Sequence, residues 1–228
     1  MQATSGDPSL SFALELEQRD EEVAERLATL AALNQGVDEV RGRADAVAAF
    51  RERLPADRAH LETAMAEAER ELTEAREALA RAHDAVERAR SEDARTTARR
   101  HEAHAASDLH TTEERRDRLL ARGKSIARES VEAESEAAEL ATKAAELAAA
   151  LETAPRVASP VPPQAGLDGV LDWAARAHAA LFVARSGLET ERERVVREAN
   201  ELAASVLGEP LYATSVATVR RRLEERLG

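Results

Sequence analysis

The chain of 228 residues contains no cysteine and few aromatic side chains, namely one Trp, one Tyr and three Phe. The absence of cysteine excludes disulfides, thiolate metal ligands and thiol catalysis. The shortage of large side chains leaves little area for a thick core, because each large apolar residue contributes about 1.5–3 kcal/mol when buried. We therefore expect a thin helical core, and a reducing, cytoplasmic location fits the missing cysteine.

Long apolar runs are also missing. No window approaches the 18 consecutive apolar residues that a membrane-spanning helix needs. The first 20 residues lack the basic stretch and the apolar run of a secretory signal peptide. We therefore expect no membrane partner.

Proline and glycine are almost absent from residues 56–153, which contain Gly123 and no proline. These two residue types are the strongest interruptions of helices. The sequence therefore predicts a helix over residues 56–153, and at 1.5 Å of rise per residue it would be roughly 147 Å long if unbroken.

Lysine is nearly absent from the basic residues, and the net charge is −12. The charge is uneven, since residues 91–122 and 154–228 are each neutral. Affinity for nucleic acid depends largely on cations that neutralise phosphates. The composition therefore argues against a general polyanion binder, although local basic patches remain.

A first helix is predicted from about Ser9 to Leu54. Its apolar residues are three or four positions apart, close to the 3.5-residue period of a coiled-coil seam. Pro55 is predicted to end it, because proline disfavours the helical conformation of the preceding residue. A turn at residues 54–57 would then make this helix an antiparallel neighbour of the next one. The predicted stripe is Val23, Leu27, Leu30, Leu33, Val37, Val40, Ala44, Val47, Phe50 and Leu54.

The next seam alternates steps of four and three, which suits a narrow antiparallel coiled coil. Past residue 89, the residues at the positions that continue this seam are mostly polar. Thr111 and Glu114 form a possible capping box, so a break near residues 107–111 is an alternative to one continuous helix. The seam residues before the polar stretch are Leu61, Met65, Ala68, Leu72, Ala75, Leu79, Ala82, Val86 and Ala89.

The C-terminal third begins with a stiff linker over residues 154–166, which hold four of the seven prolines. A helix follows from about Leu167 to Gly208, a glycine placed as a helix C-terminal residue would be. Trp173 and Phe182 are expected to anchor it. Its seam includes Leu181, Leu188 and Leu202, and a short helix is predicted over residues 214–227.

The sequence therefore predicts an all-α fold with four segments. Residues 1–8 form a flexible tail, 9–153 a long antiparallel helical hairpin, 154–166 the linker, and 167–228 a returning helix with a short C-terminal helix. We favour an elongated arrangement in which antiparallel hairpins share the long helix 56–153. A compact four-helix bundle is the alternative.

One cluster has metal-ligand chemistry. His101, His104 and Asp108 fall on one helix face, and imidazole and carboxylate suit zinc. The spacing does not match HExxH, and a solvated helix face is the simpler interpretation. We predict no metal site and no cofactor, with these three residues as the candidates for a metal-binding bundle.

Three further motifs contain residue types that can bind phosphate or peptide ligands. Arg220, Arg221 and Arg222 are the densest basic run and the candidate for a nucleic-acid contact, although no aromatic residues accompany them for base stacking. Gly123-Lys124-Ser125 lacks the upstream glycine and the strand of a phosphate-binding loop. Residues 160–163 have the PxxP spacing, for which a plain spacer is the simpler interpretation.

The hairpin pattern from Val23 to Ala89, together with the chain end ELAASVLGEPLYATSVATVRRRLEERL, resembles the coiled-coil arms of SMC and Rad50-like ATPases. The resemblance implies an arm segment that works near DNA in chromosome maintenance, repair or defence. The phosphate-binding loop, signature motif and acidic strand of those ATPase heads are absent from this sequence, so no functional residue carries over.

The sequence favours a non-enzymatic structural or interaction protein that acts as a spacer, scaffold or arm and binds protein partners or itself through helical faces. A nucleic-acid-contacting helical module is the alternative, and a metal-binding bundle is the second alternative. The interface residues we expect are Leu61, Leu72, Leu79, Val86, Leu181, Leu188 and Leu202.

Overall fold

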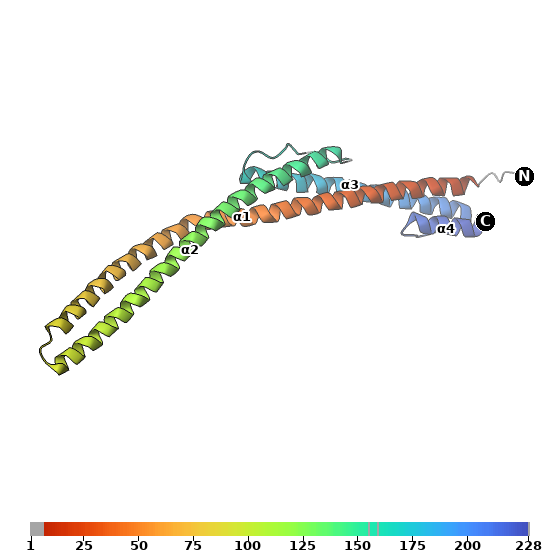
Figure 1. Ribbon diagram of the computed structural model, residues 1–228. Coiled ribbons are helices and arrows are strands. Elements are labelled where there is room, and N and C mark those ends of the chain that lie inside the picture. Colours follow the sequence, from red (N-terminus) through yellow and green to blue (C-terminus); the bar gives the residue numbers. More distant parts are fainter. Residues whose placement is uncertain (1–6, 155, 159, 228) are drawn as a thin grey trace, which may run out of the picture. The chain divides into compact units, whose positions relative to one another are not determined.

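The computed structural model describes residues 7–154, 156–158 and 160–227, and this part of the chain forms four α-helices and no strand. The helices are α1 (Pro8–Arg88), α2 (Glu92–Thr153), α3 (Leu167–Leu207) and α4 (Val216–Leu227) (Figure 1). The predicted all-α fold class is confirmed. Most of the predicted tail, residues 1–6, lies outside the described residues.

Pro55 lies inside α1, so the predicted turn at residues 54–57 is wrong. A proline removes one backbone N–H and crowds the carbonyl four residues earlier, here that of Arg51. Residues 51–53 and 55–60 are exposed, so water can satisfy this carbonyl. The two predicted seams also share one phase, because Leu54 and Leu61 are one heptad apart. A continuous helix therefore keeps both seams on one face.

The chain reverses instead at residues 89–91, so a single helix over 56–153 and a break at 107–111 are both wrong. The backbone N–H of Ala94 donates to Ser91 Oγ at 3.2 Å, which caps α2. Glu92 and Asp93 add negative charge in the first turn, where the helix dipole favours it. Thr111 is interior to α2 and donates its hydroxyl hydrogen to the Ser107 carbonyl at 3.0 Å.

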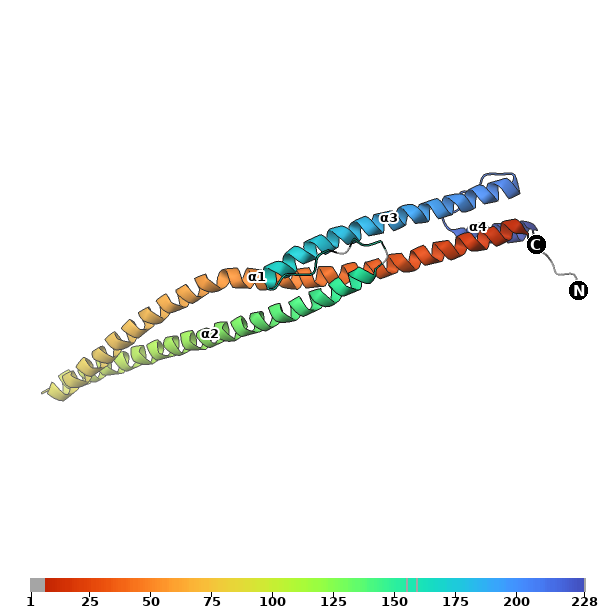
Figure 2. The same ribbon diagram turned by 90° about the horizontal axis from the view of Figure 1, so that it is seen from above.

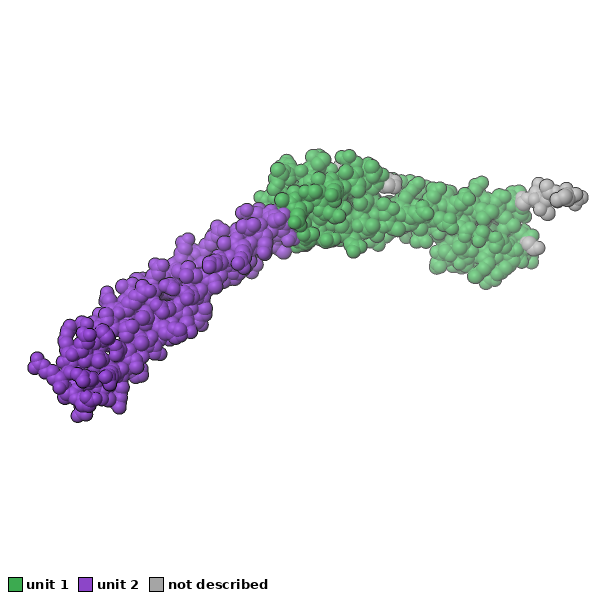
Figure 3. Space-filling view, viewed as in Figure 1, with its two compact units in different colours: residues 1–45, 138–228 green, residues 46–137 purple. Residues whose placement is uncertain are grey.

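The chain divides into two compact units, residues 46–137 and residues 1–45 with 138–228 (Figure 3). Both α1 and α2 contribute to each unit. The helical segments within each unit determine its core.

The unit of residues 46–137 is an antiparallel two-helix hairpin, in which the second part of α1 lies beside the first part of α2 (Figures 1 and 2). Its register follows from cross-helix contacts near both ends, His83 with Glu102 and Arg58 with Ser130. The α1 arm, residues 46–88, is roughly 65 Å long at 1.5 Å of rise per residue. A narrow antiparallel pair of helices is what the Leu and Ala spacing predicts, but residues 56–88 lie beside α2 and not beside residues 9–54 as predicted.

In the other unit, α3 runs antiparallel to the first half of α1. Arg19 pairs with Glu198 at 3.1 Å, and Arg192 donates to Asp20 at 2.8 Å. The sequence predicts two hairpins that share the long helix 56–153, so the pairing of α3 with the first half of α1 differs from that prediction. Only the end of α2 joins this unit, where Leu147 lies against Gly36 of α1.

The core of this unit extends along α1 and α3. Trp173 is fully buried as predicted, whereas Phe182 is 69% exposed and does not anchor α3. At the other end, α4 covers a cluster contributed by three helices. That cluster contains Ala13, Leu16, Val195, Ala199, Ala203, Val216, Val219 and Leu223.

The boundaries of α3 agree with the sequence. Gly208 takes the left-handed conformation, with φ 75°, and its N–H bonds the Ala204 carbonyl. At the other end the linker lies close against the helix, because a Cβ at Gly169 would lie 2.2 Å from the Gln164 carbonyl oxygen. Only glycine allows this approach. None of the described helices combines the length and the apolar character that a membrane span requires.

Candidate interaction surfaces

The hairpin seam is thin. Leu72 is buried, at 5% exposure, whereas Leu61, Leu79 and Val86 are half-buried. The α2 arm approaches this seam closely at Gly123, because a Cβ atom there would lie 3.2 Å from Leu61 Cδ2. Close approach of the two helices thus depends on small residues as much as on leucine.

Ion pairs cross the hairpin beside this seam. Arg115 of α2 pairs with both Glu71 and Glu67 of α1, the latter at 3.9 Å, and Arg76 lies 3.8 Å from Glu113. These side chains are about half exposed, and exposed pairs contribute about 0–1 kcal/mol each. They therefore favour this register of the two helices more than they add to the free energy of unfolding.

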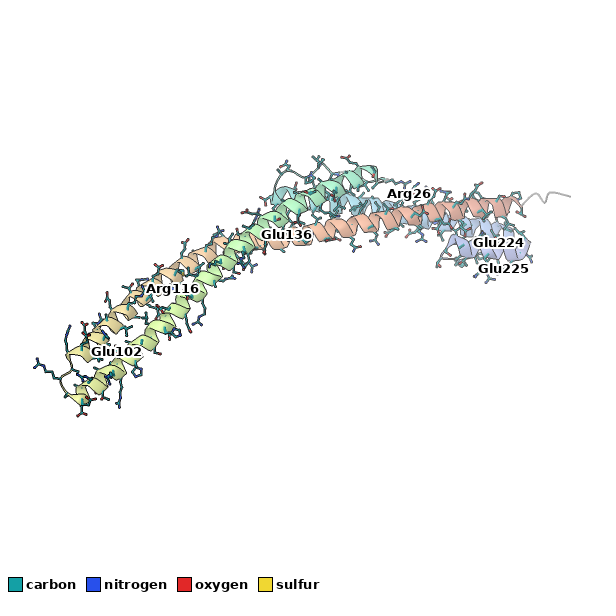
Figure 4. All side chains as sticks on the ribbon, viewed as in Figure 1. Arg26, Glu102, Arg116, Glu136, Glu224 and Glu225 are labelled. Atoms are coloured by element: carbon teal, nitrogen blue, oxygen red, sulfur yellow. The ribbon has the colours of Figure 1, made fainter. Side chains whose placement is uncertain are left out.

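His83 of α1 also has a carboxylate partner across the hairpin. Its Nδ1 lies 2.7 Å from Glu102 Oε1, and its Nε2 lies 3.7 Å from Glu87 (Figure 4 labels Glu102). The hydrogen bond to Glu102, followed by the charges of Glu102 and Glu87, raises the pKa of His83 above its usual value of 6.5. The sequence pattern does not predict this pair, because 19 positions separate the two residues and only the turn at residues 89–91 brings them together.

In α3, Leu181 and Leu188 are buried against α1, and Leu202 is half-buried beside the α4 cluster. Asn200 holds the loop before α4. Its amide donates to the Ala213 carbonyl at 2.9 Å, and its carbonyl oxygen accepts from the Ala213 N–H at 2.8 Å. This two-bond contact fixes the position at which α4 begins to pack.

An open groove of about 310 Å³ lies between α1 and α3. Leu30 and Leu181 form its floor, and Phe182 and Arg185 lie on its rim. His178 is half-buried, and its Nδ1 lies 3.2 Å from Asp38 Oδ1 without hydrogen-bond geometry.

The metal candidates His101, His104 and Asp108 are all exposed on α2. No group of three or more His, Asp or Glu side chains in the described part of the chain is placed to hold a metal ion. The shared face that their spacing predicts therefore does not bring them together as a ligand set.

The basic run in α4 is largely neutralised by carboxylates. Arg220 lies 3.0 Å from Glu17 and 3.7 Å from Glu224, and Arg222 lies 3.4 Å from Glu225 (Figure 4 labels both acids of α4). Only Arg221 of the three extends from the surface without a carboxylate partner among the described residues. The geometry does not favour a phosphate contact here.

The two remaining motifs lie in ordinary structural settings. Gly123, Lys124 and Ser125 are in the interior of α2, and Ser125 donates to Glu129 at 2.6 Å. The PxxP residues 160–163 are non-helical. The nearby Arg156 pairs with Glu191 of α3, which ties the linker to that helix.

No protein-family model, no curated protein and no solved structure matches this chain.

Proposed function

We propose that this chain is a structural element that acts as a spacer, scaffold or arm, without enzymatic activity. The hairpin of residues 46–137 carries this proposal. Two long helices packed through a thin seam place the turn at one end of the unit, and both faces away from the seam are charged and exposed. Such a unit provides length and surface at a small cost in core residues.

The partners that this role implies are other proteins, or further copies of the chain, bound through helical faces. An arm segment of an SMC or Rad50-like complex is the specific form of the proposal, and a cytoplasmic location accompanies it. The support is the hairpin itself and the resemblance in sequence pattern. Co-purification of an ATPase with a phosphate-binding loop would support this form, and a tagged chain that recovers no such ATPase from its own host would contradict it.

Small-angle X-ray scattering with in-line light scattering tests the spacer role directly. One hairpin arm alone is roughly 65 Å long. A spacer should therefore give a monomeric or dimeric particle with a maximum dimension above about 100 Å. A monomer near 70 Å would mean that the units fold onto each other, and the spacer role would be rejected.

A matched pair of variants links that measurement to the seam. Leu72→Asp places a charge in the buried seam and should reduce helicity and open the hairpin. Thr73→Asp changes the neighbouring exposed position and should leave the scattering profile unchanged. Equal effects from both variants would contradict the assignment of the seam.

A further inference from the structure

The turn of the hairpin is basic, although the chain as a whole is acidic. Residues 88–101, here called the hairpin tip, contain five arginines against Glu92 and Asp93, a net charge of +3. The whole chain has a net charge of −12. The tip therefore has the opposite sign from the net charge of the chain. Residues 115–128 are also basic, but most of their arginines have carboxylate partners, namely Arg115, Arg116, Arg118 and Arg122.

Most of these arginines have no carboxylate partner among the described residues. Arg88 lies 3.0 Å from Asp84, but the side chains of the other four are exposed and make no ion pair within the described chain. The four are Arg90, Arg95, Arg99 and Arg100.

The neighbouring acids have other partners. Glu102 and Glu87 both lie against His83, at 2.7 and 3.7 Å. Glu92 and Asp93 occupy the first turn of α2, where they complement the helix dipole. The tip thus differs from the middle of the hairpin, where Arg76 and Arg115 pair with carboxylates across the two helices.

We infer that the hairpin tip binds the phosphate backbone of duplex nucleic acid without reading its sequence. Guanidinium groups match phosphate geometry with paired donors, and their charge does not titrate near neutral pH. Contacts to phosphates position a protein on a duplex but carry no sequence information. Sequence-independent binding of this kind has dissociation constants of roughly 10⁻⁴–10⁻⁶ M at physiological salt.

The test is a fluorescence anisotropy titration of a labelled 20-base-pair duplex of random sequence with the full chain. Four unpaired arginines predict a slope of about −3 to −4 in log K against log salt, or roughly a hundredfold loss of affinity between 50 and 200 mM. The variant R95E/R99E/R100E should bind at least tenfold more weakly than the wild-type chain. Because these side chains are exposed and unpaired, the variant should keep the wild-type circular dichroism and melting temperature.

The matched control is R51E/R197E/R221E, which makes the same change in total charge. These three arginines are also exposed and lack carboxylate partners among the described residues. The control should weaken binding less than threefold. Equal losses in both variants would overturn the proposal, because net charge rather than the tip would then determine affinity.

Two further results would also overturn it. The first is absence of binding by the wild-type chain at 50 mM salt. The second is binding of a labelled polyglutamate peptide as tightly as the duplex, which would make the tip a contact for acidic protein segments.

Discussion

The side chain of Leu147 in α2 lies against Gly36 in α1, where a Cβ atom at position 36 would be 3.0 Å from Leu147 Cδ2. A Cβ atom at Gly42, about two turns further along α1, would have no atom within 4 Å. A glycine in a helix costs about 1 kcal/mol relative to alanine. An alanine would therefore fit freely at position 42 but would crowd Leu147 at position 36.

We expect Gly42→Ala to raise the free energy of unfolding by up to about 1 kcal/mol, since only helix propensity changes. Gly36→Ala gains the same propensity but overpacks the contact with Leu147, which typically costs about 1–3 kcal/mol. It should therefore be neutral or destabilising in urea titrations. In a chain that already carries Leu147→Ala, Gly36→Ala should lower the free energy of unfolding less than it does in the wild type. If the effects of the two substitutions on this free energy simply add, the contact between Gly36 and Leu147 is contradicted.

Pro55→Ala should stabilise α1. The substitution restores the N–H that bonds the Arg51 carbonyl and removes the ring that crowds it, with an expected gain of up to about 3 kcal/mol. Thermal melting followed by circular dichroism would measure the gain. Ala59→Pro, one turn further on and also exposed, should destabilise by a similar amount. An unchanged melting temperature in Pro55→Ala would mean that α1 is interrupted at Pro55.

Leu72→Ala and Leu79→Ala should differ in cost. Loss of a buried leucine typically costs about 2–5 kcal/mol, and Leu72 is the more deeply buried of the two. We expect a loss near the lower end of that range for Leu72→Ala and a smaller loss for Leu79→Ala in urea unfolding. The opposite order would place the centre of the hairpin seam elsewhere.

Asn200→Ala should release the loop before α4. The substitution removes both hydrogen bonds to Ala213 and leaves partly buried backbone groups unpaired, with an expected cost of about 1–3 kcal/mol. Amide hydrogen exchange should accelerate in α4 more than in α1. Asn34→Ala removes only an exposed hydrogen bond to Asp38, at 2.8 Å, and serves as the control. Unchanged exchange in α4 would show that burial of Val219 and Leu223 alone holds it.

The His83–Glu102 pair should make hairpin stability depend on pH. Because the folded state raises the pKa of His83, protonation favours folding. The stabilisation is fully present below the unfolded pKa of about 6.5 and is lost as the pH rises through the folded pKa. The melting temperature of wild type should therefore exceed that of His83→Gln at pH 5.5, and the difference should shrink by pH 8.5.

The control for this pH effect is His60→Gln, which changes an exposed histidine of the same unit that makes no ion pair within the described chain. Any pH dependence that His60→Gln shares with His83→Gln would not come from the pair with Glu102. A difference for His83→Gln that stays constant between the two pH values would show that the pair with Glu102 does not form in solution.

Local patterns in the sequence were sufficient to predict which residues face each seam. The steps of three and four identify Val37, Val40 and Leu188 as interior, and each is buried. The end of α3 at Gly208 was equally predictable, since a glycine in the left-handed conformation is a local property of the chain. Phe182 shows the limit, because a large apolar residue off the seam stays exposed.

The chain reversal could not be placed in this way. Pro55 is the strongest local signal for a break, but its cost is offset by a seam that continues in phase on both sides. Ser91, followed by Glu92 and Asp93, carried the correct signal as a helix N-terminus. Pairings between seams were also unpredictable, because stripes of leucine and alanine fit one another in many registers. The His83–Glu102 contact depends on that register.

Because the chain reverses within three residues at Ala89–Ser91, the length of the hairpin can change without a change in its turn. Both arms repeat with a period of seven residues, so equal numbers of heptads inserted into each arm would preserve every facing pair beyond the insertion. Each added pair of heptads would move the turn outward by roughly 10.5 Å. The reach of such an arm can therefore be changed in steps without redesign of its turn.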